Sequence, residues 1–378
     1  MKPLLTSFCL TALALPGFSI DNVDLRHELE VRGAEAKRVF SVRLPASYDQ
    51  QDEYDYPVLY VLDGEVNLDH ASAVASFLAE NALIPEMIVV AVHGGGTRAQ
   101  DYLPAANAND FLETLTERIV PFVEKEYRAA PLRVLTGHSY GGVFVTHAML
   151  ERPEAFSAYL AQSPFLDDEI GGSLLARAAE ELGKPADRRS QDPRVRFYAT
   201  LGDEPALSSH FDRLTEIVQN SGLVHGRTFR DETKSHMTTR LVGLYSGLEW
   251  AFADEWPWAP SSGTDEGGGD LVDHLEALSE RYGYPVLASE SAFQTATQSL
   301  MGGQRVEDAR ETAQLYSRQY PRSVLARYLL GAVLAAGGDK AASLEQLSEG
   351  IRLYEADPRP ELVPVLETMK QMRTALSN

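Results

Sequence analysis

The stretch LRVLTGHSYGGVFVTHAML, residues 132–150, decides the fold. Its first part is an apolar run that favours a buried strand, and its last part is an apolar run that favours a helix. Between them stands Gly137-His138-Ser139-Tyr140-Gly141, a G-x-S-x-G motif. A strand, a sharp turn and a helix in this order form a nucleophile elbow, which exposes a serine hydroxyl at the end of the strand. We therefore predict that Ser139 is a nucleophile.

Predicted strands and helices alternate on both sides of this stretch. Residues 56–64 (YPVLYVLDG) and 87–96 (MIVVAVHGGG) are continuous apolar runs, the pattern of strands that are buried on both faces. Helix-like segments separate these runs, and residues 194–203 (RVRFYATLGD) continue the rhythm. The alternation predicts an α/β fold in which helices flank a mostly parallel sheet, and the elbow makes it an α/β-hydrolase fold.

The composition changes after this domain, which we place at residues 20–253. Residues 254–270 (DEWPWAPSSGTDEGGGD) are rich in Gly, Pro, Ser and acidic residues, as expected of a linker. Residues 271–378 show only helical patterns, and the helix-turn-helix around Gly338-Asp339 is similar to a tetratricopeptide unit. We predict a small all-α, tetratricopeptide-like domain there; a generic helical hairpin packed on the larger domain is the alternative.

The N-terminus has the features of a secretory signal peptide. A short basic start precedes an apolar stretch over residues 4–18 that is too short to span a bilayer, and small residues suit cleavage after it. We expect residues 1–19 to be removed and the protein to be exported, periplasmic or secreted. The only cysteine, Cys9, lies in this segment, so the mature chain would have no disulfide and no catalytic thiolate.

The charge restricts the partners of the protein. The 378 residues include 55 acidic and 34 basic side chains, which give a formal net charge of −21. Such a charge repels nucleic-acid phosphates and anionic membrane surfaces, so we exclude nucleic acid as a partner. An anionic substrate would also be repelled unless basic residues near the site create a local positive field.

A serine nucleophile needs a general base, and in this fold the chain order is serine, acid, histidine. His236 lies in a polar loop just before a predicted helix (DETKSHMTTRL, residues 231–241), where its imidazole can reach the elbow. The remaining histidines after the elbow lie on its helix, in helical or turn segments, or beyond the linker: His147, His210, His225 and His274. We predict that His236 is the base.

The acid of the triad should follow the strand at residues 194–203. Asp203 and Glu204 are adjacent there; we prefer Glu204, keep Asp203 as the alternative acid and place Asp212 third. The carboxylate would hold the imidazole in the correct tautomer and stabilise its charged form without accepting the proton.

An oxyanion hole requires two backbone N–H groups directed at the tetrahedral oxygen. Tyr140, directly after the nucleophile, should provide one of them. The loop after an early strand, residues 62–65, should provide the other, and we favour Glu65, with Gly64 as the alternative. The three glycines at residues 94–96 are a competing donor, although a tight loop is sufficient reason for them.

Several motifs together resemble one family. YPVLYVLDGE, TRAQDYLP, GHSYGG, LGDE and SHMTT occur in the order found in the putative esterase family of α/β-hydrolases, which includes enterochelin esterases, S-formylglutathione hydrolases, feruloyl esterases and mycolyltransferases. The resemblance covers residues 22–253 and implies a triad of Ser139, Glu204 and His236. It also implies that Arg98 and Asp101 lie near the site, where a structural ion pair and substrate contact by Arg98 are the alternatives.

These residues predict a serine esterase that hydrolyses a small-molecule carboxylic ester through an acyl-enzyme. Two alternatives keep the same fold: an acyltransferase in which an alcohol replaces water, and a binding or scaffold protein with an inert core. We expect no metal and no organic cofactor, because the sequence has no HExxH motif and no clustered ligand spacing. The C-terminal helices are candidates for a protein contact or self-association.

Overall fold

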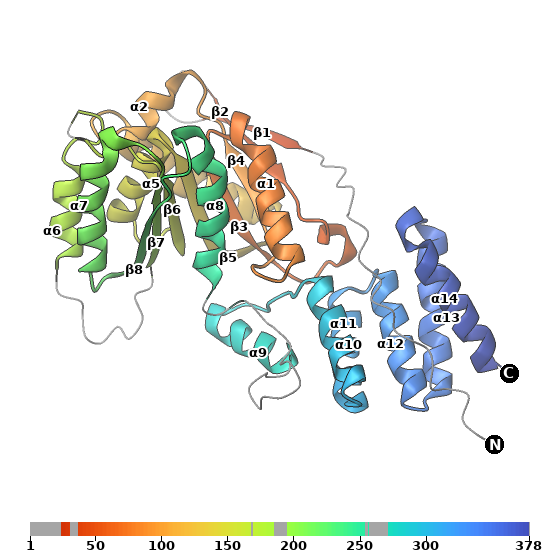
Figure 1. The fold of residues 1–378 in the computed structure, drawn as a ribbon. Helices are drawn as coiled ribbons and strands as arrows, with labels where there is room; N and C mark the ends of the chain where they lie inside the picture. Colours follow the sequence, from red (N-terminus) through yellow and green to blue (C-terminus); the bar gives the residue numbers. More distant parts are fainter. Residues whose placement is uncertain are drawn as a thin grey trace.

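The structure is a computed structural model that describes residues 24–30, 37–167, 169–184, 195–253, 256 and 271–377. A mixed sheet with helices on both faces forms the larger part, and further helices follow it (Figure 1). The expected signal peptide and most of the expected linker lie outside the described residues, so the predicted domain limits stay predictions. No helix in the described ranges is long and apolar enough to cross a membrane.

One eight-stranded sheet is present in the described part of the chain. Its strands are β1 Leu25–Leu29, β2 Arg38–Arg43, β3 Tyr56–Leu62, β4 Ile88–Val92, β5 Ala129–His138, β6 Ala158–Gln162, β7 Val195–Leu201 and β8 Val224–Arg230. Their order across the sheet is β1-β2-β4-β3-β5-β6-β7-β8. All neighbours from β4 to β8 are parallel, whereas β2 is antiparallel to both β1 and β4. This confirms the predicted α/β class with a mostly parallel sheet.

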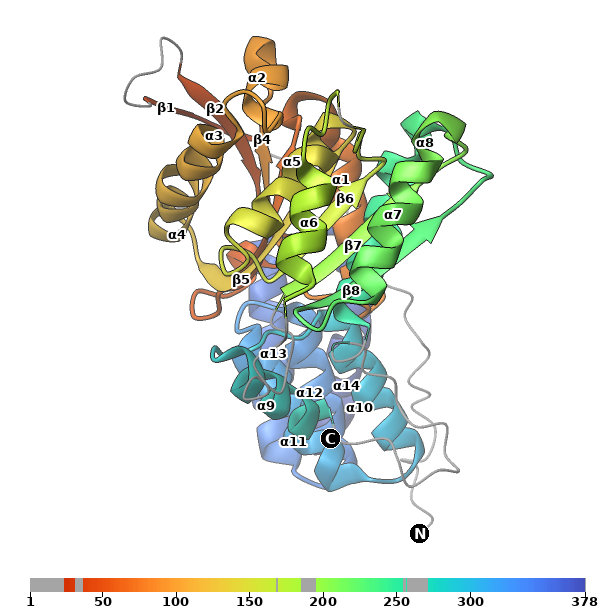
Figure 2. The ribbon, with the colours of Figure 1, turned by 90° about the vertical axis from the view of Figure 1, so that its left-hand side faces the viewer.

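Helices cover both faces of this sheet (Figure 2). The helices of this part are α1 Gly64–Glu80, α2 Arg98–Tyr102, α3 Ala108–Thr114, α4 Val120–Glu126, α5 Tyr140–Glu151, α6 Leu174–Leu182, α7 Ser208–Gln219 and α8 His236–Phe252. α1 and α8 pack against each other on one face, while α3 to α7 cover the other. In a parallel sheet covered this way, a site forms where the carboxyl ends of the strands meet the N-termini of helices.

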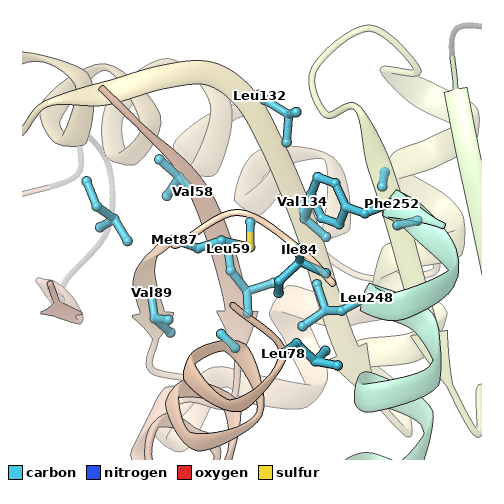
Figure 3. Close-up of a cluster of buried hydrophobic side chains, with 14 of the residues drawn as sticks. Val58, Leu59, Leu78, Ile84, Met87, Val89, Leu132, Val134, Leu248 and Phe252 are labelled. Carbon is cyan, nitrogen blue, oxygen red and sulfur yellow. The ribbon is translucent and has the colours of Figure 1, made fainter. Parts of the chain in front are cut away.

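Burial follows from the position of each strand in the sheet. Every residue of β3, β4 and β6 is buried, because helices cover both faces of these central strands. The edge strands β1 and β8 alternate between more and less exposed residues instead. In the core, Leu59 of β3 and Val134 of β5 lie close to Leu78 of α1 and Leu248 of α8 (Figure 3).

The sequence patterns above do not predict β6 or β8. β6 has only five residues, and it follows the elbow helix after a short turn without the long apolar run of the other central strands. β8 begins at Val224 and contains glycine and two arginines, so its sequence is only weakly strand-like. His225, expected in a helical or turn segment, lies on this strand.

A helical region follows the sheet and covers the edge at which its strands begin (Figure 1). Its helices are α9 Leu271–Tyr282, α10 Glu290–Gly302, α11 Val306–Gln319, α12 Val324–Ala336, α13 Lys340–Ala356 and α14 Val363–Ser377. Two of its side chains bond to the sheet part: Ser291 donates to the Glu80 carbonyl at 2.7 Å, and Arg322 donates to the Asp49 carbonyl at 2.7 Å.

The predicted helix-turn-helix around Gly338-Asp339 is present as α12 and α13. Gly338 has a φ of 85°, which suits a glycine in a tight turn. Ser343 donates to the Gly331 carbonyl across the two helices at 2.7 Å, so small residues allow a close crossing. The helical C-terminal region is therefore confirmed, and its assignment as tetratricopeptide-like stays a prediction.

Candidate active site

Ser139 occupies a strained turn between β5 and α5. Its φ of 62° and ψ of −119° lie in a region that residues with a side chain rarely adopt. The turn is tight enough that a Cβ on Gly137 would lie 2.5 Å from the Gly141 carbonyl oxygen, so Gly137 cannot carry a side chain. A hydrogen bond of 2.9 Å from the Ser139 amide to the Gln162 carbonyl anchors the turn to β6. The predicted strand, turn and helix are all present.

His236, the first residue of α8, is bound to Glu204. Its Nδ1 lies 2.6 Å from Glu204 Oε2, and the carboxylate follows the end of β7. Since Nδ1–H donates to the carboxylate, Nε2 is left free to accept a proton. The His236 ring also lies against the elbow, because its centroid is 4.4 Å from that of His138, the residue before Ser139. Within the described part of the chain, no residue forms a hydrogen bond with the Ser139 hydroxyl.

Glu204 is held by three donors. Its Oε1 accepts hydrogen bonds from Ser163 Oγ at 2.6 Å and from the Gly202 amide at 3.0 Å, in addition to His236 on Oε2. Burial alone would raise the pKa of Glu204, but the three donors outweigh burial and hold the pKa below its ordinary value. The carboxylate is therefore ionised at neutral pH and stabilises a charged imidazole.

Neither of the two other candidate acids forms a hydrogen bond with His236. Asp203 is exposed, and its amide donates to the Lys234 carbonyl at 2.7 Å. Asp212 lies on α7, where it accepts a hydrogen bond from Arg230 at 2.7 Å. The structure thus brings Glu204 to the histidine and leaves Asp203 and Asp212 outside the site.

His138 fastens the histidine segment to the elbow strand. Its Nε2 lies 2.6 Å from the His236 carbonyl oxygen, which accepts the hydrogen bond. Burial, followed by the nearby His236, lowers the pKa of His138 to about 4, so its ring is neutral at pH 7 and carries its proton on Nε2. No sequence motif predicts this role of His138, because it depends on the contact between the end of β5 and the start of α8.

The N-termini of α1 and α5 meet beside Ser139. A Cβ on Gly141 of α5 would lie 3.5 Å from the Cβ of Leu62, two residues before α1 begins. Tyr140 and Gly64 are the first residues of these two helices, and the first amides of a helix have no partner within it. The first turns of two helices therefore lie beside Ser139, an arrangement that suits a developing oxyanion.

The glycine loop at residues 94–96 has a different role. The amides of Gly94 and Gly95 each donate to the Glu65 carboxylate at 3.0 Å. These bonds commit two amides of the loop to a side chain, so they are not free to bind an oxyanion. They also fix Glu65 at the beginning of α1.

Arg98 binds Asp63 and not Asp101. Its Nε and Nη2 donate to the two Asp63 oxygens at 2.6 and 2.9 Å, and Nη2 also approaches the His138 carbonyl at 3.3 Å. Asp101 is buried and instead accepts a hydrogen bond from Arg38 of β2 at 2.7 Å. Arg98 therefore links the residue before α1 to the residue before Ser139.

Comparison with known proteins identifies the family of the chain. A sequence profile of the putative esterase family matches residues 33–250, more than half of the chain. The chain belongs to this family.

This esterase-family chain is 31% identical over 134 residues to the apo-salmochelin esterase of Escherichia coli, which covers 29% of the chain and 42% of that relative. The matched segments span 20–60% of the lengths of four curated relatives, less than two thirds of each. Sequence similarity to these relatives is thus confined to part of each protein.

Two solved structures share the fold. One is an IroE-like serine hydrolase from Shewanella oneidensis, with a TM-score of 0.63 and 23% identity, covering 78% of this chain and 99% of that one. The other is an uncharacterised protein from Capnocytophaga ochracea, with a TM-score of 0.58 and 16% identity, covering 94% of this chain and 99% of that one. The second match extends over most of the C-terminal helices as well.

Proposed function

We propose that this chain is a serine esterase that hydrolyses a small-molecule carboxylic ester through an acyl-enzyme. Ser139 is the nucleophile, His236 the general base and acid, and Glu204 the carboxylate that orients the imidazole. The observation that carries the proposal is the 2.6 Å contact between Glu204 and His236 Nδ1, beside the elbow of Ser139. Membership in an esterase family supports the same reaction.

The reaction follows from the protonation of the site. His236 Nε2 accepts the proton as Ser139 Oγ attacks the ester carbonyl, and Glu204 stabilises the imidazolium that forms. His236 then gives the proton to the leaving alcohol, and the acyl-enzyme remains on Ser139. Water repeats the sequence and releases the acid.

The tetrahedral oxygen needs two donors. We assign one to the Tyr140 amide at the start of α5 and the other to the Glu65 amide in the first turn of α1, with Gly64 as the alternative. The Asp63–Arg98 ion pair supports this assignment, because it joins the segments that carry the two donors.

The relatives suggest which esters to test first. Several are named as siderophore esterases, including enterobactin, triacetylfusarinine C and salmochelin esterases. A siderophore ester is therefore a first candidate beside simple acetyl and butyryl esters. We also infer export of the protein, on the basis of its predicted signal peptide.

The test compares Ser139→Ala with the wild-type protein on 4-nitrophenyl acetate, 4-nitrophenyl butyrate and a panel of siderophore and feruloyl esters. We expect kcat to fall about 10⁴-fold or more, because no other group replaces the nucleophile. Ser348→Ala on α13 is a matched control and should keep wild-type turnover. A serine-directed phosphonofluoridate should add its mass to the wild type and not to Ser139→Ala. Full turnover by Ser139→Ala would refute the proposal.

A further inference from the structure

Arg240 lies on α8, one helical turn after His236, and is only partly exposed. The arginines near this edge are otherwise neutralised: Arg98 by Asp63, Arg38 by Asp101, and Arg230 by Asp212. Arg240 differs from them, because it has neither an ion pair nor a hydrogen bond with any residue that the structure describes. It is a cation without an internal partner in a strongly acidic protein.

The Arg240 charge acts between α1 and α8, close to the elbow. α1 and α8 run side by side (Figure 1). Burial, followed by the charge of Arg240, lowers the pKa of His70 on α1. Arg240 also contributes to the low pKa of His138, after burial and His236. The charge of Arg240 therefore acts on His70 of α1 and on His138, the residue before Ser139.

Exposed apolar side chains adjoin the catalytic segments on the same two helices. Val66 is 60% exposed and follows Glu65, whereas Met237 is 55% exposed and follows His236. Leu241 is 46% exposed and lies one turn after Met237, on the same side of α8. Large apolar side chains that are exposed at the beginnings of two neighbouring helices, close in sequence to catalytic residues, suit the apolar body of a substrate.

The mechanism decides which part of the substrate lies there. His236 must give its proton to the leaving alcohol, so the alcohol part of the ester lies on the His236 side of the tetrahedral carbon. Met237, Arg240 and Leu241 belong to the same helix as His236. We expect the acyl group on Ser139 to point away from this helix, because the alcohol part occupies the side of His236.

We propose that Arg240, together with the exposed Val66, Met237 and Leu241 on the same two helices, forms a subsite for the alcohol part of an ester that carries a negative charge beyond a short apolar spacer. The inference rests on the proposed esterase function. An unpaired guanidinium attracts a carboxylate or phosphate in a geometry that allows two hydrogen bonds. It also provides the local positive field that an acidic protein needs to accept an anionic substrate.

A pair of substrates with one acyl group tests the subsite. 4-Acetoxybenzoate carries a carboxylate on its alcohol part, and methyl 4-acetoxybenzoate is its neutral counterpart. The kcat/KM of both esters is measured for the wild type, Arg240→Gln and Arg240→Lys. Arg213→Gln on α7 is the control, since it removes an equal charge from an exposed position on the other face of the sheet.

We expect Arg240→Gln to lower kcat/KM for the anionic ester about tenfold, mainly through KM, and to change the neutral ester less than about twofold. Arg240→Lys should keep most of the preference, and added salt should weaken it. Arg213→Gln should behave as the wild type.

Equal losses on both esters would show that Arg240 is structural, and no loss on either would remove the subsite; both results overturn the inference. Ser139-dependent hydrolysis of the neutral ester tests the proposed function separately. Failure of both esters to react in the wild type would count against that function and against the subsite with it.

Discussion

The two edges of the central sheet differ in what they contain. At the edge where the strands end, Ser139 is held at a strained φ, Glu204 binds His236, and the N-termini of α1 and α5 meet. At the opposite edge, where the strands begin, α9 to α14 close over buried side chains such as Tyr56 and Tyr320. We infer from this difference that turnover and stability depend on separate parts of the molecule. Substitutions at the first edge should change mainly rates, and substitutions at the second mainly unfolding.

After Ser139→Ala, the largest effect is expected from Glu204→Gln. The amide cannot stabilise an imidazolium and can favour the wrong tautomer, so kcat should fall about 10²–10⁴-fold while the melting temperature changes little. Because the pKa of Glu204 lies below its ordinary value, the loss should be constant across neutral pH. Steady-state kinetics on 4-nitrophenyl butyrate measures it. Asp203→Asn is the control and should stay within about threefold of the wild type; equal losses in both variants would contradict the assignment.

A smaller loss is expected from Arg98→Gln. This change leaves the Asp63 carboxylate buried without its partner and loosens the link between α1 and the elbow. We expect kcat to fall about 10–100-fold on neutral and anionic esters alike, as for a weakened oxyanion hole. Arg98→Lys should recover part of the rate. A rise in KM confined to anionic esters would instead make Arg98 a substrate contact.

At the opposite edge, Glu86 should make stability depend on pH. Burial raises the pKa of Glu86 to about 7, and the nearby carboxylates of Glu290 and Glu80 act in the same direction. The native state therefore retains a proton that the unfolded chain loses, so stability should fall as the pH rises from about 4.5 to about 7. The cost is absent below this window and complete above it.

Glu86→Gln removes this titration. The free energy of unfolding at pH 8 should rise by about 1–3 kcal/mol relative to the wild type, a range that allows for the partial exposure of Glu86. The slope of stability against pH between pH 5 and pH 7 should flatten. Urea unfolding across this range measures both, and kcat should not change. Glu355→Gln, at an exposed position on α13, is the control that should keep the wild-type slope. An unaltered slope in Glu86→Gln would show that another group causes the dependence.

The smallest effect is expected from Arg322→Ala. Its ion pair with Asp52 joins the helices to the sheet part, but the two side chains are 51% and 69% exposed. Exposed pairs contribute about 0–1 kcal/mol, so the urea midpoint should shift only slightly and turnover should not change. A large fall in kcat would show that the two edges of the sheet are coupled, so that turnover and stability do not depend on separate parts of the molecule.

The sequence predicts best what local patterns determine. The strand, turn and helix around Ser139 could be predicted from the sequence, because Gly137 and the apolar runs on both sides of the motif all favour this one local structure. β6 and β8 could not, because a five-residue strand and a charged edge strand become strands only when β5 and β7 are beside them. Pairing partners that are far apart in sequence decide such elements.

The same limit applies to the site. The sequence places Asp203 and Glu204 side by side, and only the fold directs Glu204 toward His236 while Asp203 is exposed. Ser163, which directly follows β6 and has a φ of 42°, supplies a donor to Glu204 that no motif reveals. Asp101, three residues after Arg98 on α2, is not its ion-pair partner, because Arg38 from β2 binds Asp101 and Arg98 binds Asp63.

The hydrogen bond from the ring of His138 to the backbone of His236 has a consequence for motion. It joins the last residue of β5 to the first residue of α8, which lies 98 positions later in the sequence. Fluctuations of the outer loops should therefore displace donor and acceptor of the transferred proton together. The distance between Ser139 Oγ and His236 Nε2 would stay nearly constant while the surrounding loops move.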